Sequence, residues 1–230
     1  MRKVILDTET TGLDYRTGDR LVEIGCVEML GRQLTGVRFH KYINPEREVP
    51  AGAIAVHGLT DDFLADKPKF REVVDEFMDF VRDAEIIIHN AAFDVGFLNN
   101  ELGLLQKDSI EQLSRCVTDT LRMAREIRPG KKNNLNALCS EFGIDNASRT
   151  LHGALLDAEL LAEVYLAMTR GQNSLLMNFT PQPSTIATDT VITRPPLKVL
   201  CATEFELSAH ADLLEAMRKE NKGKCLWSAE

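Results

Sequence analysis

The segment that most constrains the fold is residues 4–13, VILDTETTGL, near the start of the chain. Its apolar beginning predicts a buried strand, which runs into Asp7 and Glu9 before a Thr-Thr-Gly turn. Successive side chains of a strand point to opposite faces, so these two acids share one face. Two carboxylates at that spacing repel each other unless something positive lies between them. We therefore expect a cation at the end of this strand.

The rest of the first 170 residues combines strand and helix patterns. Segments 20–30 and 34–43 flank Gly31-Arg32-Gln33 and predict an antiparallel hairpin, and residues 44–62 are interpreted as a loop. The elements predicted after it are a helix at 70–81, a buried strand at 85–89, a helix at 93–102, a strand and helix within 116–127, and helices at 135–142 and 154–168. Strands that come first and then alternate with helices predict an α/β fold with a mixed β-sheet flanked by helices.

The composition changes after residue 171. Residues 172–195 contain only two charged residues and are rich in Thr, Ser, Gln and Pro, which is typical of a flexible linker. Residues 196–230 predict an extended segment at 197–201 and a small amphipathic helix at 208–220, with Ser208 as its N-cap. Roughly 35 residues cannot bury much core alone, so this tail is expected to fold against a partner. The predicted organisation is a domain at 1–171, a linker at 172–195 and a C-terminal partner-binding tail at 196–230.

Composition restricts the function classes further. The net charge of −8 argues against broad affinity for nucleic acid, although metal ions can still hold such a substrate locally. No apolar run approaches the ~20 residues that span a bilayer. The first strand begins by about residue 3 and leaves no room for a signal peptide, so a cytoplasmic location is expected. The five cysteines are scattered, which predicts reduced core thiols rather than disulfides or a thiolate zinc site.

Two further acids stand beside predicted turns. Asp94 ends the motif HNAAFD, where a buried strand gives way to a helix, and Asp157 lies on the helix that begins after Gly153. Such strand-end turns can converge in one crevice of a layered sheet. A purely carboxylate set favours Mg²⁺ or Mn²⁺ over zinc, and two such ions ~4 Å apart can activate a water and stabilise the leaving oxygen of a phosphodiester. A single Asp at a helix start is more often a cap, so the prediction depends on the whole set.

His152 is the candidate base for that water, because an imidazole titrates near neutral pH. Asp157 lies five residues further on, about 140° around an ideal helix. The two side chains would therefore share a site only if His152 lies outside the helix. Gly153 makes such a start plausible.

In this order the motifs resemble those of the DEDDh family of 3′–5′ exonucleases, which have a ribonuclease-H-like fold. D-x-E-T-T-G matches residues 7–12, H-N-A-x-F-D matches 89–94 and H-x-x-x-x-D matches 152–157, and the resemblance covers about residues 2–170. It implies that His152 is the general base and that two divalent ions are held by Asp7, Glu9, Asp94 and Asp157. It also implies contacts with the 3′-terminal nucleotide by Thr10, Thr11, Gly12, His57 and Phe93. Phe93 is equally well interpreted as a core aromatic.

The family contains proofreading exonucleases, exoribonucleases and DNA-repair exonucleases. The linker and tail favour a proofreading enzyme that removes mispaired nucleotides from a single-stranded or frayed DNA 3′ end, because the simpler exoribonucleases generally stop near the last helix. The resemblance implies that the tail binds a DNA polymerase subunit, and Leu226 and Trp227 are the candidate apolar anchors. The segment with Gln172 and Leu175 is similar to sliding-clamp-binding peptides, or is an apolar helix end that packs on its own domain. A small accessory subunit is a further possible partner.

Three alternatives remain distinguishable. An RNA-processing exonuclease of the same fold would differ in its turnover on DNA and RNA. A catalytically inactive adaptor would lack one of the acids, and none is missing. A single-metal phosphatase would leave the tail without an explanation.

Overall fold

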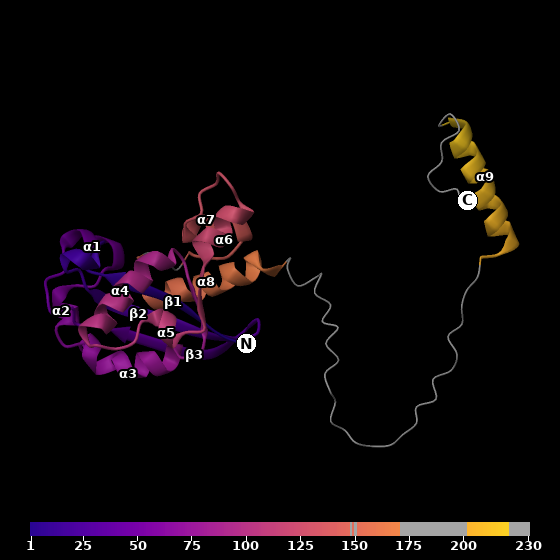
Figure 1. Ribbon diagram of the computed structural model, residues 1–230. Coiled ribbons are helices and arrows are strands. Elements are labelled where there is room, and N and C mark those ends of the chain that lie inside the picture. Colours follow the sequence, from indigo (N-terminus) through magenta and orange to yellow (C-terminus); the bar gives the residue numbers. More distant parts are fainter. Residues whose placement is uncertain (148, 150, 171–201, 221–230) are drawn as a thin grey trace, which may run out of the picture. The chain divides into compact units, whose positions relative to one another are not determined.

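The computed structural model describes residues 1–147, 149, 151–170 and 202–220 (Figure 1). The chain divides into two units, Met1–Asn178 and Phe179–Glu230. The expected boundaries at 171/172 and 195/196, and the extended segment at 197–201, lie at or within the part that is not described. They stay predictions.

A mixed five-stranded sheet forms the centre of the first unit, in the order β3-β2-β1-β4-β5. The strands β1, β2 and β3 pair antiparallel, whereas β4 pairs parallel with β1 and with β5. The predicted hairpin and the predicted mixed sheet are confirmed. The strand bounds are Arg2–Thr10 (β1), Leu21–Leu30 (β2), Gln33–Tyr42 (β3), Glu85–Ile88 (β4) and Cys116–Asp119 (β5).

Helices flank this sheet (Figure 1). The interpretation of residues 44–62 as a loop is wrong, because α1 and the start of α2 lie inside it. Both helices are too short for hydrophobic periodicity to reveal, and α2 depends on a local cap in which the Thr60 hydroxyl accepts a hydrogen bond from the Phe63 amide at 3.3 Å. The helical segments of this unit are η1 (Tyr15–Thr17), α1 (Ala51–His57), α2 (Asp61–Leu64), α3 (Phe70–Val81), α4 (Ala91–Leu104), α5 (Ile110–Leu113), α6 (Thr120–Ile127), α7 (Leu135–Phe142) and α8 (Ala154–Met168).

Strand β1 is buried on both faces. The alternation of its side chains between the two faces determines on which face the acids lie. Val4 and Leu6 belong to the core cluster that contains the apolar side chains of α3 and α4, whereas Ile5 belongs to the cluster that contains those of α7 and α8. Asp7 and Glu9 follow Ile5 at intervals of two residues, so their side chains point to the same face as that of Ile5. The two acids therefore lie on the face of the sheet that α8 covers.

Gly25 of β2 allows α8 to approach that face closely. It is paired with Asp7 in the sheet, and a Cβ atom at this position would lie 2.2 Å from the backbone nitrogen of Leu155. A side chain here would therefore push the first turn of α8 off the sheet. The glycine thus brings the beginning of α8, two residues before Asp157, directly over the end of β1.

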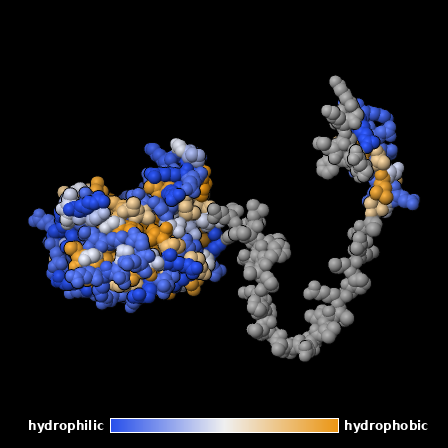
Figure 2. Space-filling view, in the orientation of Figure 1, coloured by the Kyte–Doolittle hydropathy of each residue, from blue (hydrophilic) through white to orange (hydrophobic). Residues whose placement is uncertain are grey.

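The described part of the second unit is a single helix, α9 (Glu204–Glu220). The prediction that this helix begins at Ser208 is wrong. Thr203 and Glu206 form a capping box, in which the Thr203 amide donates to the Glu206 carboxylate at 2.8 Å and the Glu206 amide donates to the Thr203 hydroxyl at 3.3 Å. This cap starts the helix four residues earlier. Its apolar side chains include Phe205, which is 82% exposed. Figure 2 shows hydrophobic surface on this helix.

None of the helices in the described ranges is long and apolar enough to cross a membrane. Of the cysteines in those ranges, Cys26 and Cys139 are buried thiols and Cys116 is an exposed one.

Candidate active site

The four acids and His152 line one cavity of about 490 Å³. Asp7 and Glu9 come from the end of β1, Asp94 from the first turn of α4 and Asp157 from the first turn of α8. The structure thus brings together the whole set that the sequence singled out. We call this space the catalytic cavity.

Asp94 is held against β1 by Thr8, the residue between the two acids of that strand. The amide and the hydroxyl of Thr8 donate to the same Asp94 oxygen, at 3.1 and 2.7 Å. Because alternate residues of β1 point to opposite faces, one strand presents two carboxylates and also anchors a third. Asp94 and Asp157 are each 3% exposed.

Burial and mutual repulsion make it costly to ionise these acids together. Burial raises the pKa of Glu9 to about 8, with a further contribution from the charge of Asp157. Burial likewise raises the pKa of Asp94 to about 7. The pKa of Asp7 lies well above its ordinary range, first because of burial and then because Asp94, Asp157 and Glu9 surround it. Positive charge in the cavity would reverse these shifts.

Arg149 supplies one positive charge, and the sequence reasoning missed it. Its Nε and Nη2 atoms each donate to one Asp157 oxygen at 2.5 Å, which gives a bidentate ion pair. Nη1 donates to the side-chain oxygen of Asn136 at 2.7 Å. The Arg149 side chain is only 6% exposed. Arg149 precedes α8 outside any regular element, so no periodicity pointed to it.

His152 lies outside α8, as its predicted role requires. Gly153 is the extended N-cap of that helix, and the amide of His152 donates to the Val56 carbonyl at 3.1 Å. The Nδ1 atom lies 3.4 Å from an Asp157 oxygen and 2.9 Å from the Arg149 Nη2. Burial, and then the charge of Arg149, lower the pKa of His152. The ring is therefore neutral at pH 7 and can accept a proton.

The residues of the catalytic cavity fit a divalent cation. Ligand atoms of Glu9, His152 and Asp157 all lie within 4.8 Å of one another. Buried carboxylates with raised pKa values are hard oxygen ligands that gain most from a cation of this kind. Asp7 and Asp94 line the same space and complete the oxygen set. For Asp157 to act as a ligand, it must either bind the cation while it keeps its ion pair with Arg149 or give up that ion pair.

The predicted nucleotide-contacting residues line a second cavity of about 500 Å³, which shares Thr8, Glu9, Leu13 and Phe93 with the first. We call it the terminal cavity, and its further lining includes Thr10, Thr11, Gly12 and His57. Its wall is a rigid turn, because the Thr10 hydroxyl donates to the Gly12 carbonyl at 2.6 Å and the Thr11 hydroxyl donates to Asp19 at 3.2 Å.

Two aromatic side chains, His57 and Phe93, line the terminal cavity. His57 is 6% exposed, its Nδ1 accepts from the Leu59 amide at 3.0 Å, and its buried Nε2 has no hydrogen-bond partner among the described residues. Phe93 packs against Phe97 with ring centroids 4.9 Å apart and also lines both cavities. It is thus a packed aromatic, and its contact with a nucleotide stays a prediction. Gln172, Leu175, Leu226 and Trp227 lie outside the described ranges, and their roles stay predictions.

The fold and the clustered carboxylates define the class of a metal-dependent nuclease, and the comparisons with known proteins agree. Residues 4–165 match the family model described as Exonuclease, so the chain belongs to this exonuclease family. The nuclease domain of 3′hExo, a DEDDh family member solved with rAMP, shares the fold with a TM-score of 0.64 at 17% identity, covering 74% of this chain and 92% of that one. The expected ribonuclease-H-like fold is thereby confirmed.

Similarity to particular proteins extends over nearly the whole chain. It is 50% identical to the DNA polymerase III subunit epsilon of Escherichia coli K12, over 99% of this chain and 98% of that protein. It is 48% identical to the DNA polymerase III subunit epsilon of Salmonella typhimurium, with the same coverage. Both of these relatives, which the chain matches over nearly their whole length, are epsilon subunits.

Proposed function

We propose that this protein is the 3′–5′ exonuclease proofreading subunit of a bacterial replicative DNA polymerase. It removes mispaired 3′-terminal nucleotides by hydrolysis of the phosphodiester, with two divalent ions. The observation that carries the proposal is the single cavity in which Asp7, Glu9, Asp94 and Asp157 surround one space beside His152. The full-length similarity to DNA polymerase III epsilon subunits supports the assignment to proofreading.

The ions, Mg²⁺ or Mn²⁺, supply Lewis-acid stabilisation of the leaving oxygen and lower the pKa of the attacking water. Asp7, Glu9, Asp94 and Asp157 are their proposed ligands. The imidazole of His152 takes the proton of the water. Nδ1 accepts from Arg149 in the present geometry, which places the ring hydrogen on Nε2. Once Arg149 has left Nδ1, the ring can adopt its other tautomer, in which the hydrogen is on Nδ1 and is donated to Asp157. Nε2 is then the proton acceptor.

The terminal cavity would hold the nucleotide that is to be released. Its rigid turn at residues 10–12, the ring of Phe93 and the free Nε2 of His57 provide backbone, stacking and hydrogen-bonding contacts. Selectivity for a mismatch then needs no reading of base edges. An unpaired end frays into a single strand more easily than a paired one, because unstacking it costs less.

The partners follow from charge and exposed apolar surface. A chain with net charge −8 has little general affinity for DNA, so a tether to the polymerase would raise the effective concentration of the primer end. We assign that tether to residues 196–230, where α9 exposes Phe205 and Leu213 and where Leu226 and Trp227 follow. The proposed partner is the DNA polymerase III alpha subunit, in the cytoplasm. The segment with Gln172 and Leu175 would contact the sliding clamp, and a small accessory subunit would bind the nuclease domain.

A gel assay tests the activity directly. The substrate is a 5′-labelled DNA duplex with a mispaired 3′ end, incubated with Mg²⁺, with Mn²⁺ or with EDTA. We expect stepwise shortening from the 3′ end with either ion, none with EDTA, and slower turnover on a matched RNA. Asp94→Ala should abolish shortening, whereas Asp75→Ala, which removes an acid that is 80% exposed, should not. Near-normal activity of the Asp94 variant would contradict the site assignment.

Deletion of residues 181–230 tests the tether. The shortened chain should still degrade single-stranded DNA, because the catalytic and terminal cavities lie entirely within the first 157 residues. It should no longer co-elute with the alpha subunit in size-exclusion chromatography. Stable co-elution of the shortened chain would show that the tail is not the tether.

A further inference from the structure

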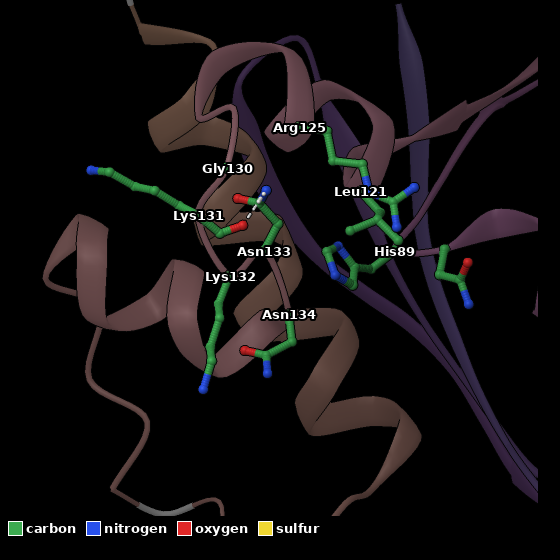
Figure 3. A pocket seen from close by; sticks show the side chains of 9 residues that line it. His89, Leu121, Arg125, Gly130, Lys131, Lys132, Asn133 and Asn134 are labelled. Atoms are coloured by element: carbon green, nitrogen blue, oxygen red, sulfur yellow. Dashed lines mark hydrogen bonds between the residues drawn. The ribbon is translucent and has the colours of Figure 1, made fainter.

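A third cleft, of about 750 Å³, adjoins the catalytic cavity and is not explained by the hydrolysis itself. It lies between α6 and the loop that leads to α7 (Figure 3). His89, Asn90 and Asn134 line both this cleft and the catalytic cavity. Arg125 of α6 and Lys131 and Lys132 of the loop give it a basic lining. We call it the basic cleft.

The charge of this region is opposite to that of the chain. Residues 120–134 contain five Lys or Arg residues and one Glu, a net charge of +4, in a chain whose net charge is −8. Arg122, Arg128 and Lys131 have acidic partners in Glu126 and Glu141. In the described ranges no acidic side chain forms an ion pair with Arg125 or Lys132. These two cations are therefore available to an external anion.

The loop that carries Lys131 and Lys132 is held in place by its own hydrogen bonds. Gly130 turns the chain with a φ of +76°, a conformation that glycine adopts readily. The Asn133 side chain is 8% exposed and donates to the carbonyls of Lys131 at 3.1 Å and Arg128 at 3.4 Å, the first of which Figure 3 marks. Arg128 Nη1 donates to the Lys132 carbonyl at 3.3 Å. These hydrogen bonds hold the loop that forms one side of the basic cleft in a defined conformation.

The order in which the three spaces adjoin one another indicates which part of a DNA strand the basic cleft would hold. The terminal cavity shares Glu9 and Phe93 with the catalytic cavity, which in turn shares His89 and Asn134 with the basic cleft. Under the proposed function, the 3′-terminal nucleotide occupies the first space and the scissile phosphate the second. The nucleotides on the 5′ side of the scissile phosphate must then leave through another opening. The basic cleft, which adjoins the catalytic cavity and shares no lining residue with the terminal cavity, offers such an opening.

We propose that the basic cleft binds phosphates of the single DNA strand on the 5′ side of the scissile bond, through Arg125 and Lys132. Among the described residues that line it, the imidazole of His89 is the only aromatic ring on which a base could stack, so the contacts are to the backbone and are independent of sequence. Such contacts position the strand and offset the repulsion that an acidic protein exerts on DNA. The inference rests on the proposed nuclease activity and adds a binding site to it.

The test compares Arg125→Ala/Lys132→Ala with the wild-type chain on substrates of different length. The p-nitrophenyl ester of thymidine 5′-monophosphate has no nucleotide on the 5′ side, whereas oligo(dT) of eight nucleotides has several. Neither mutated residue lines the catalytic cavity, so hydrolysis of the ester should be unchanged within two-fold. KM for the oligonucleotide should rise by about ten-fold, and the slope of log KM against log salt should fall by ~1.4, since each lost contact with a single strand contributes ~0.7.

The matched control is Arg71→Ala/Lys107→Ala, which removes the same charge. Arg71 and Lys107 form exposed ion pairs with Glu46 and Asp75, and neither residue lines the catalytic cavity or the terminal cavity. It should retain the wild-type KM and salt slope. Equal KM values and salt slopes for the two double variants would overturn the proposal, as would an equal loss of ester hydrolysis and DNA hydrolysis in the Arg125/Lys132 variant. If the wild-type chain hydrolyses neither substrate, the proposed nuclease function itself fails, and the basic cleft loses its ligand with it.

Discussion

Replacement of Glu9 by glutamine in the metal-free protein measures how far the catalytic cavity destabilises the fold. The folded-state pKa of Glu9 is raised from 4.5 to about 8 because the carboxylate is buried near Asp157. Between these two pH values the folded chain holds a proton that the unfolded chain has released. Stability therefore falls as the pH rises through this window. Glutamine keeps the size of the side chain and removes its charge, so that the part of this dependence that Glu9 causes should disappear.

The size of the effect follows from the shift. One pKa unit corresponds to about 1.36 kcal/mol, and integration of the linkage relation from pH 5.5 to pH 8 gives about 3 kcal/mol for Glu9 alone. Asp7 and Asp94 act in the same direction, since their pKa values are also raised. The metal-free wild-type protein should thus lose at least about 3 kcal/mol of unfolding free energy over this interval. The Glu9→Gln variant should lose about 3 kcal/mol less.

Urea unfolding in EDTA at pH 5.5, 7 and 8 provides the measurement. Far-ultraviolet circular dichroism is the suitable signal, because the only tryptophan, Trp227, lies outside the described ranges. Glu76→Gln is the control: Glu76 is 61% exposed and pairs with Lys41 on the surface, so its replacement should leave the pH dependence unchanged. The reasoning is refuted if the metal-free wild type gains stability between pH 5.5 and 8, or if Glu9→Gln keeps the full wild-type slope.

Three further predictions concern the same site. Gly25→Ala should lower the unfolding free energy in urea by about 2 kcal/mol or more, because its Cβ would collide with the backbone of Leu155; unchanged stability would contradict the close approach of α8. Arg149→Ala should lower the melting temperature in EDTA, since Asp157 loses its buried partner, and should tighten Mn²⁺ binding in calorimetry; weaker binding would argue against competition. Calorimetry should also count two Mn²⁺ ions per chain, and Asp7→Asn should bind fewer.

The clustering of the four acids could be predicted from the sequence because each acid stands at a position that secondary structure fixes. The pleat of β1 places Asp7 and Glu9 on one face, and the two remaining acids lie in the first turns of α4 and α8. The sequence pattern could not predict that α8 packs closely against the sheet at this place. That depends on Gly25, and a glycine within a strand pattern indicates only a bulge or a close backbone approach, without naming the partner.

Other features were missed for different physical reasons. Arg149 lies in irregular backbone, where no period assigns a direction to a side chain, so its ion pair with Asp157 is visible only in three dimensions. The beginning of α9 was missed although its signal was present. The sequence T-x-x-E at 203–206 is a capping box, and it takes precedence over the single capping residue Ser208 because it satisfies two backbone donors.

Arg149 also bears on how many ions the cavity needs. Its charge already lowers the pKa values of Asp7 and Glu9, yet both remain raised, so one cation is too little for four buried acids. A single divalent ion that displaced Arg149 would leave two positive charges beside four carboxylates, whereas two ions would carry four, which equals the charge of the four carboxylates. Burial makes any remaining imbalance expensive. This charge balance supports the proposal of two ions rather than one, in which Arg149 would hold Asp157 until the ions bind.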